Sequence, residues 1–150
     1  YRPDDVSSRR LRGKRMVVQA SNIGTDVFDG QFDLMVPGGG VGLFDACSRQ
    51  WSVGGAPDMG ATYGGFLSRC QQQIPQEDPE AVYEATRECV RHMCDAAFRK
   101  PNLEDKPAIA FLLEPCHWFV DWYETADNPN FMYREVQCPQ AIHERAGTWG

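Results

Sequence analysis

Residues 31–42 read Gln31-Phe32-Asp33-Leu34-Met35-Val36-Pro37-Gly38-Gly39-Gly40-Val41-Gly42 and combine a strand pattern with a run of glycines. In its first half, Phe32, Leu34 and Val36 occupy alternate positions, which predicts a strand with Asp33 on the face away from the apolar set. Four of the five residues after Pro37 are glycines, which adopt backbone conformations closed to other residues. We therefore expect a tight backbone crossing directly after the strand that carries Asp33.

Three further apolar or aromatic runs are typical of strands. They comprise residues 16–19, 116–123 and 130–138, and the last two are separated by the turn-forming phrase Ala126-Asp127-Asn128-Pro129. Together with the strand over 31–36, they predict a mainly β chain in which residues 116–123 and 130–138 form a strand pair.

One segment has a different character. Asp78, Pro79 and Glu80 provide a helix N-cap, a proline at the first helical position and an acidic first turn. Apolar residues then recur at helical spacing from Val82 to Phe98. The sequence predicts an amphipathic helix over residues 79–99.

Charge and length narrow the classes of partner. A chain of 150 residues fits one domain, and its net charge of -6 repels nucleic-acid phosphates and anionic lipids. No stretch is long and apolar enough for a membrane span. We expect neither a nucleic-acid nor a membrane partner, and a neutral or cationic partner fits better.

The cysteines indicate disulfides and an oxidising compartment. There are six of them, and none forms a Cys-x-x-Cys pair. The three histidines are scattered, which gives a zinc site little support, so we expect no metal. Buried thiols of a cytosolic protein are the alternative interpretation, and spacing alone does not fix the connectivity.

Several phrases, taken in order, resemble the carboxyl-terminal part of glycoside hydrolase family 45 endoglucanases. They are Gly13-Lys14-Arg15-Met16-Val17-Val18-Gln19, Phe32-Asp33-Leu34 with the glycine run, Phe44-Asp45-Ala46-Cys47, Tyr63-Gly64-Gly65, Trp118, Asp121-Trp122, Ala126-Asp127-Asn128-Pro129 and Val136-Gln137-Cys138-Pro139. They are collinear and cover nearly the whole chain outside residues 71–115.

The resemblance implies a fold and an activity. The family has a six-stranded double-psi β-barrel, which we expect to be incomplete in this chain, with residues 1–150 as one partial catalytic domain and 71–115 as a helical insertion. It hydrolyses β-1,4-glucan with inversion and needs no cofactor. Carried over residue by residue, Asp33 is the general acid, Asp26 in the preceding loop assists it, and Tyr63 lies near the substrate groove. Trp118 is a further candidate for stacking on sugar rings.

The resemblance fails at one point. The family's catalytic base belongs to a Tyr-Trp-Asp-Cys-Cys motif near its amino terminus, and this sequence has no such motif. We therefore expect the missing amino-terminal segment of the same domain to be required, in a secreted, extracellular protein. The resemblance also pairs Cys70 with Cys116 and gives Cys47 and Cys138 upstream partners. Cys89 and Cys94 are additional, and either bridge each other or rearrange that pairing.

Weaker interpretations stay open beside this one. Without the resemblance, Asp33 is interpreted as a solvated aspartate at a strand end and Asp26 as a turn-forming residue. Most aromatic residues, Trp118 included, are interpreted as core residues. At the level of function, the missing base favours a non-hydrolytic, expansin-like polysaccharide-binding or wall-loosening protein. An inactive structural relative is the third hypothesis.

Overall fold

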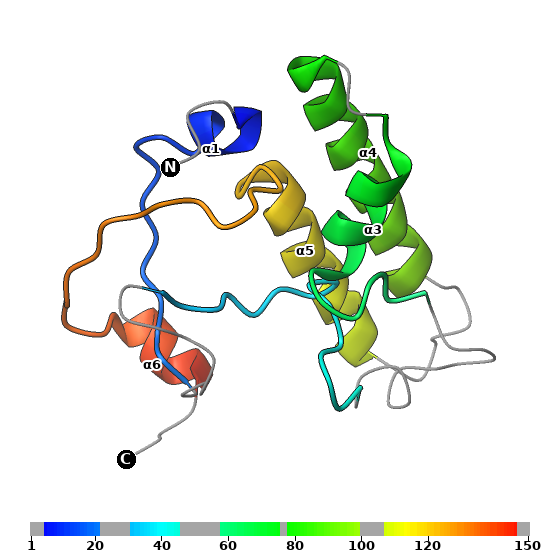
Figure 1. Cartoon of the computed structure of the whole chain (residues 1–150). Helices are drawn as coiled ribbons and strands as arrows, with labels where there is room; N and C mark the ends of the chain where they lie inside the picture. The colour runs from blue at the N-terminus through cyan, green and yellow to red at the C-terminus, as the bar shows by residue number, and fades with distance from the viewer. Residues whose placement is uncertain (1–4, 22–30, 46–57, 76–77, 100–106, 147–150) are drawn as a thin grey trace.

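The computed structural model describes residues 5–21, 31–45, 58–75, 78–99 and 107–146. Its helices in this part are α1 (Val6–Arg10), α3 (Gly65–Gln73), α4 (Pro79–Phe98), α5 (Pro107–Asp121) and α6 (Gln140–Ala146). Figure 1 shows α3, α4 and α5 packed together, with α6 at the other side of the molecule and long irregular segments between them. No described helix has the length and apolar character needed to cross a membrane.

Helix α4 organises the helical body and confirms the prediction of a helix over 79–99. Asp78 caps it, because its side chain accepts a hydrogen bond from the Ala81 amide at 2.8 Å, and Pro79 occupies the first turn. The buried stripe runs along one face through Tyr83, Thr86, Val90, Cys94, Ala97 and Phe98. This face provides the surface against which α3 and α5 pack.

The core lies between these three helices. Its most buried side chains are Phe66, Val90, Val120 and the three cysteines Cys70, Cys94 and Cys116. Phe66 on α3 contacts Phe98 at the end of α4, with 6.1 Å between the ring centroids. The core therefore consists of residues from 59 to 120 and sits on the helical side of the molecule.

Two disulfides join α4 to its neighbours, and they correct the pairing that the resemblance implied. Cys70 pairs with Cys89, and Cys94 pairs with Cys116, so Cys70 and Cys116 do not pair with each other. Cys94 is five positions after Cys89, which places them about 140° apart around the helix and about 7.5 Å apart along it. Each therefore meets a different neighbouring helix, and they cannot bridge each other.

The other two cysteines have different outcomes. Cys138 is a free, exposed thiol. Cys47 lies outside the described residues.

The predicted strand over residues 116–123 is wrong, because α5 continues to Asp121. Cys116 and Val120 are four residues apart and both are fully buried, so a helical period points them at α4. Trp118, near the end of α5, stacks on Trp122, which directly follows the helix, with 5.2 Å between the ring centroids. Packing against α4 overrides the β-propensity of this run.

The remaining predicted strands, residues 16–19, 31–36 and 130–138, have no regular secondary structure. A strand forms only where a neighbouring backbone pairs with it, and no described segment pairs with these three. Phe32 and Phe131 do meet edge to face with 4.6 Å between their centroids, so two of the predicted strands touch at this point. The double-psi barrel stays a prediction for this chain, as does the insertion over 71–115.

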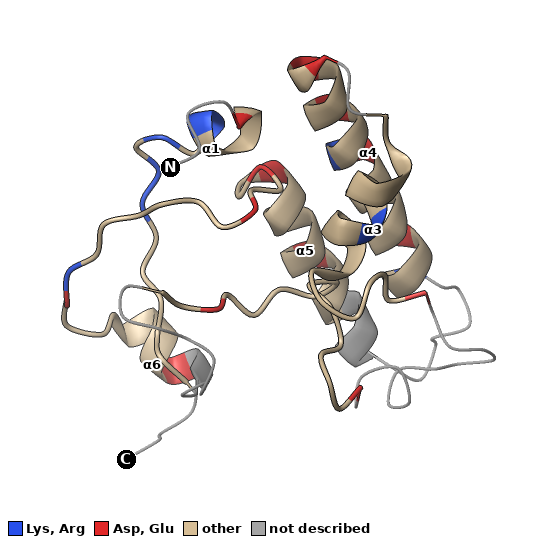
Figure 2. Ribbon diagram, viewed as in Figure 1, with Lys and Arg blue, Asp and Glu red and all other residues tan. Residues whose placement is uncertain are grey.

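Helix α1 attaches the start of the described chain to the helical body. Asp5 caps it by accepting hydrogen bonds from the Ser8 amide and the Ser7 hydroxyl at 2.9 and 2.7 Å. Arg9 and Arg10 form exposed ion pairs with Glu80 on α4 at 3.2 and 3.3 Å. Figure 2 shows basic positions in blue on α1 and acidic positions in red on the first turns of α4.

Candidate active site

The glycine run crosses the start of α3, which confirms the predicted tight backbone crossing. The Phe66 amide donates to the Gly38 carbonyl at 2.8 Å, and the Gly42 amide donates to the Thr62 carbonyl at 3.0 Å. A Cβ on Gly65, whose φ is +50°, would lie 1.9 Å from the Gly38 oxygen, a distance that no side chain allows. The absence of a side chain on these glycines is what lets the two segments approach.

Tyr63 lies at this crossing. It forms an isolated antiparallel bridge with Gly40. Its side chain is 69% exposed, so the ring is free for contact with a ligand instead of being used in the core. The crossing therefore connects Tyr63 to the segment that carries Asp33, four residues before Pro37.

Asp33 is exposed, and so are Phe32 and Met35 beside it, while Leu34 and Val36 are partly covered. Because the segment is irregular and not a strand, Asp33 has no strand face, and its exposure follows from the exposure of the segment as a whole. Asp26, the predicted assisting carboxylate, lies outside the described residues.

Trp118 is half-buried on α5. Its ring stacks on Trp122 with 14° between the planes, and it also contacts Tyr123 at 5.6 Å between centroids. Among the described residues, the ring contacts of Trp118 are with these two side chains and not with Tyr63. They place Trp118 in an aromatic cluster at the carboxyl-terminal end of α5.

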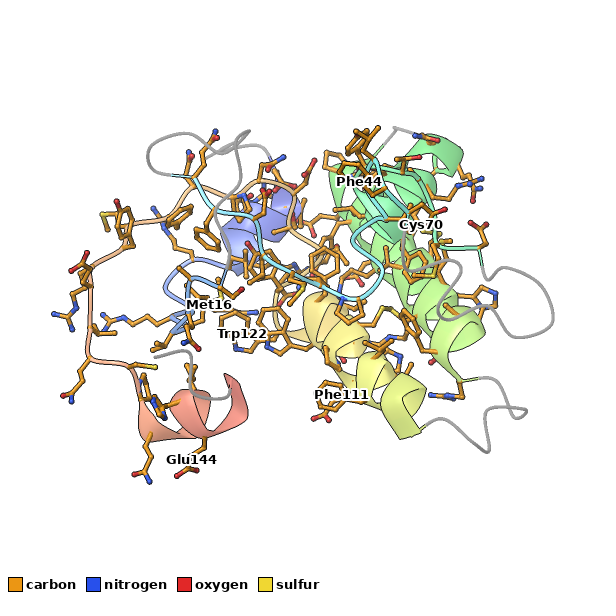
Figure 3. The ribbon with its side chains drawn as sticks, turned by 90° about the horizontal axis from the view of Figure 1, so that it is seen from below. Met16, Phe44, Cys70, Phe111, Trp122 and Glu144 are labelled. Atoms are coloured by element: carbon orange, nitrogen blue, oxygen red, sulfur yellow. A yellow bond between two sulfur atoms is a disulfide. The ribbon has the colours of Figure 1, made fainter. Side chains whose placement is uncertain are left out.

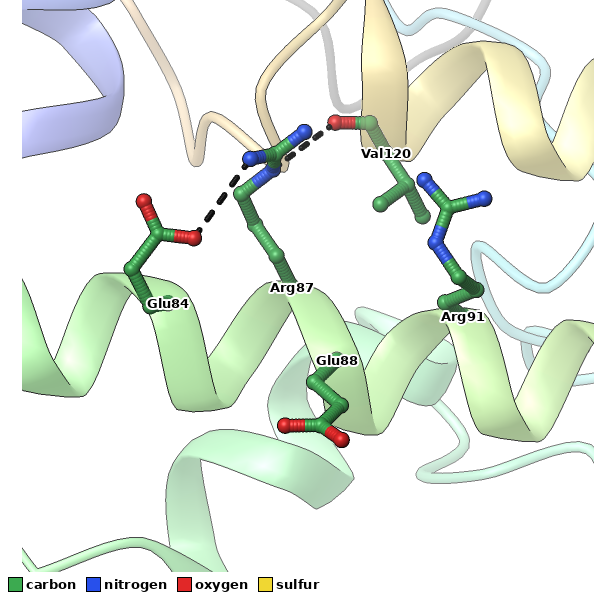
Figure 4. Close-up of a pocket in the computed structure, with 5 residues that line it drawn as sticks. All are labelled: Glu84, Arg87, Glu88, Arg91 and Val120. Carbon is green, nitrogen blue, oxygen red and sulfur yellow. Dashed lines mark hydrogen bonds and ion pairs between the residues drawn. The ribbon is translucent and has the colours of Figure 1, made fainter.

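A hollow of about 230 Å³ lies on the surface of α4, lined by Glu84, Arg87, Glu88, Arg91 and Val120 (Figure 4). Arg87 donates from Nε to the Val120 carbonyl at 3.2 Å, and Arg91 pairs with Asp121. Both guanidinium groups are thus engaged at the end of α5. The hollow is smaller than a typical ligand pocket, and none of the predicted site residues lines it.

Sequence reasoning missed a charged cluster centred on Glu124. Lys14 donates to one carboxylate oxygen at 2.6 Å, the Tyr83 hydroxyl donates to the other at 2.5 Å, and Arg87 lies 3.8 Å away. The Glu124 side chain is only 14% exposed. These residues are up to 110 positions apart in the sequence, so no local pattern indicates the cluster.

The cluster shifts the pKa of two groups in opposite directions. Burial acts to raise the pKa of Glu124, but the hydrogen bonds from Lys14 and Tyr83 and the charges of Lys14 and Arg87 outweigh it and lower that pKa below its ordinary value. Burial, together with donation to Glu124, raises the pKa of the Tyr83 phenol well above its ordinary value. At neutral pH the cluster therefore contains an ionised carboxylate and a neutral phenol.

Within the described part of the chain, no group of three or more histidine, cysteine or acidic side chains could hold a metal ion. Many large apolar side chains of the irregular segments are exposed, among them Met35, Leu43, Phe44, Met132 and Tyr133. Figure 3 shows the Phe44 and Phe111 side chains at the outside of the molecule.

Comparison with known proteins identifies relatives along most of the chain. A protein named Endoglucanase B from Cellvibrio japonicus (strain Ueda107) is 47% identical over 145 residues, which is 97% of this chain and 26% of the relative. An Endoglucanase of Cryptopygus antarcticus is 30% identical over 139 residues, 91% of this chain and 45% of the relative. Endoglucanase 1 of Mycosarcoma maydis is 30% identical over 147 residues, 95% of this chain and 28% of the relative.

This chain spans less than half the length of each of these relatives. No solved structure matches it. The family profile described as glycosyl hydrolase family 45 matches residues 3–102, which is two thirds of the chain and includes the first part of the segment 71–115. The chain therefore belongs to glycosyl hydrolase family 45.

Proposed function

We propose that this chain is part of an endo-β-1,4-glucanase that hydrolyses cellulose or a related β-glucan with inversion. Its membership of the family carries the proposal, together with relatives whose names are endoglucanases. The net charge of -6 agrees with an uncharged polysaccharide as the substrate, because such a polymer carries no phosphates or other anions to be repelled.

The role proposed for Asp33 is that of general acid. Inversion needs a protonated carboxyl that donates to the departing sugar oxygen and a second carboxylate, about 6.5 to 9.5 Å away, that activates water. The exposed position of Asp33 beside the glycine crossing leaves its carboxyl accessible to a polymer. A bound glucan that covers Asp33 would exclude water from this carboxyl and from the linkage to which it donates.

Tyr63 is proposed as a substrate-binding residue of the same site. Its exposed ring lies at the crossing that follows Asp33, and a flat aromatic ring stacks on the apolar face of a pyranose. Asp26 keeps its proposed assisting role. Trp118 stays a further candidate for stacking on sugar rings, together with Trp122, on which its ring lies.

The second carboxylate is proposed to come from a longer protein. The family's base belongs to a Tyr-Trp-Asp-Cys-Cys motif, which the 150 residues do not contain. Such a protein is proposed to be secreted, since two disulfides among the described residues suit an oxidising compartment.

The test uses a longer protein that joins this chain to a segment with that motif. We expect rapid loss of viscosity of a soluble carboxymethylcellulose, release of reducing ends, and α-configured products in the first minutes by proton NMR. Binding of glucan without any release of reducing ends would reject the enzyme and favour the expansin-like alternative. Products that are β-configured at first would reject inversion.

A further inference from the structure

Glu124 joins three parts of the chain that are distant in sequence. Lys14 reaches it from the segment after α1, and the same ammonium group donates to the Trp122 carbonyl at 2.6 Å at the end of α5. Tyr83 and Arg87 reach it from α4. The ammonium group of Lys14 also lies 5.5 Å from the centre of the Trp122 ring. One carboxylate thus fixes the segment around residue 14 to two helices.

The backbone at this point is in a rarely adopted conformation. Glu124 and Thr125 are consecutive non-glycine residues in the left-handed region, with φ of 58° and 51°. Thr125 is β-branched, 4% exposed, and held by its amide, which donates to the Phe119 carbonyl at 3.0 Å. Such a conformation persists only where the surroundings hold it in place. The contacts of Glu124 supply part of that support.

Every element around Glu124 contributes charged or titratable groups. Lys14 comes from the segment after α1, and Tyr83 and Arg87 come from α4. Arg87 also lies 3.6 Å from Glu84 and 3.7 Å from Asp121 of α5, while Arg10 of α1 lies 4.5 Å from the centre of the Tyr83 ring. The groups that contact Glu124 directly are two cations and one phenol, so they favour the ionised carboxylate.

We propose that ionised Glu124 is an acid-sensitive latch that holds the segment around Lys14 against the ends of α4 and α5, and that protonation of Glu124 releases this segment. Protonation removes the negative charge that attracts Lys14 and Arg87 and leaves an acid that competes with Tyr83 as a donor. The disulfides between α3, α4 and α5 lie outside the latch, so the helical body stays folded when the segment is released.

The stabilisation contributed by Glu124 depends on pH because the pKa of this carboxyl is lowered in the folded chain. The stabilisation is present above the ordinary pKa of 4.5 and is lost as the pH falls through the lowered value. Asp5, the cap of α1, titrates in the same acid range. Burial acts to raise the pKa of Asp5, but its hydrogen bonds with Ser8 and Ser7 outweigh this effect and lower the pKa. A test must therefore separate Asp5 from Glu124.

Hydrogen exchange of the intact chain, measured by mass spectrometry from pH 7 to pH 3, makes that separation. We expect protection factors in residues 5–15 to fall by on the order of tenfold in the acid range, while those of α4 stay unchanged. Glu124→Gln is expected to show low protection of residues 5–15 at every pH. The matched control, Asp5→Asn, is expected to weaken α1 and to keep the acid-dependent step.

Three results would overturn the latch. One is constant protection of residues 5–15 from pH 7 to pH 3 in the parent chain. Another is a full acid-dependent fall in Glu124→Gln. The third is a simultaneous loss of protection in α4, which indicates global unfolding. Should Glu124→Gln fail to fold, Lys14→Met removes the cation instead and is expected to give the same pH-independent exposure of the segment.

Discussion

The helical body and the irregular segments differ in how much of their apolar surface is buried and in what holds them in place. Helices α3, α4 and α5 bury a continuous apolar core and are joined pairwise by disulfides. The segments over 31–45 and 126–139 leave large side chains uncovered, with Met35 at 92%, Phe44 at 91% and Met132 at 100% exposure. The body is held by contacts within the described chain, whereas the segment that carries Asp33 is held by the glycine crossing and by the contact of Phe32 with Phe131.

The largest effect on this contrast is expected from removing the disulfide between α4 and α5. Replacing Cys94 and Cys116 together with serine should lower the free energy of unfolding by about 3 kcal/mol, because their separation of 22 residues closes a loop in the unfolded chain. Urea unfolding followed by far-UV circular dichroism measures it. Cys138→Ser, at an exposed free thiol, is the control and should change nothing. Equal stability of the two variants would contradict the role assigned to the helical body.

A smaller loss is expected at the glycine crossing. Gly65→Ala places a methyl group 1.9 Å from the Gly38 oxygen and should cost about 2 kcal/mol while separating the segment of Asp33 from α3. Gly13→Ala is the matched control, since Gly13 also has a positive φ but has nothing within 4 Å of the added carbon. Its cost should be about 1 kcal/mol, from conformation alone. Thermal unfolding distinguishes the two, and equal shifts would mean that the crossing is not tight.

A third prediction concerns the contribution of the Tyr83 phenol to stability. Tyr83→Phe should lower stability at pH 7 by about 1 kcal/mol, because Glu124 loses one donor. In the parent chain, the pKa of Tyr83 is raised above its ordinary value of 10.0. The stabilisation that comes from Tyr83 is therefore fully present below pH 10 and falls as the pH rises above this value. Urea unfolding at pH 8 and pH 11 should show this alkaline loss in the parent chain and a smaller one in Tyr83→Phe. An identical alkaline loss in both would remove Tyr83 from the cluster.

The smallest effect is expected at the exposed ion pairs between α1 and α4. Glu80→Gln removes one acidic partner of Arg9 and of Arg10, which also pairs with Glu84, and we expect a change below about 0.5 kcal/mol that disappears in concentrated salt. Urea unfolding at low and high salt concentration measures it. A loss as large as that of Gly65→Ala would show that α1 is held by its surface charges and not by the buried Val6 and the Glu124 cluster.

Local signals predicted part of the fold. The cap at Asp78, the proline at 79 and the apolar spacing act within the segment itself, so the helix over 79–99 followed from sequence and α4 confirms it. The glycine run predicted the crossing because only glycine permits such an approach.

The errors arose where distant contacts decide the structure. Residues 116–123 have β-prone side chains, but Cys116 and Val120 pack on α4, so the run is helical to Asp121. The disulfide pairing depends on which helices flank α4, and the Glu124 cluster on contacts across 110 positions. A local sequence pattern predicts neither the disulfide pairing nor this cluster. The predicted strands over 16–19, 31–36 and 130–138 need partner backbones, which the described residues do not supply.

We propose that the carboxyl of Asp33 donates the proton in glucan hydrolysis. The direct measurement is kcat on soluble, unsubstituted β-1,4-glucan oligomers for the longer protein and for its Asp33→Asn variant. Glu135→Gln, at another exposed carboxylate of an irregular segment, is the control. A general acid contributes about 10² to 10⁴ in rate, so we predict a loss of that size for Asp33→Asn with KM little changed, and parent activity for Glu135→Gln. Parent kcat in Asp33→Asn would contradict the claim.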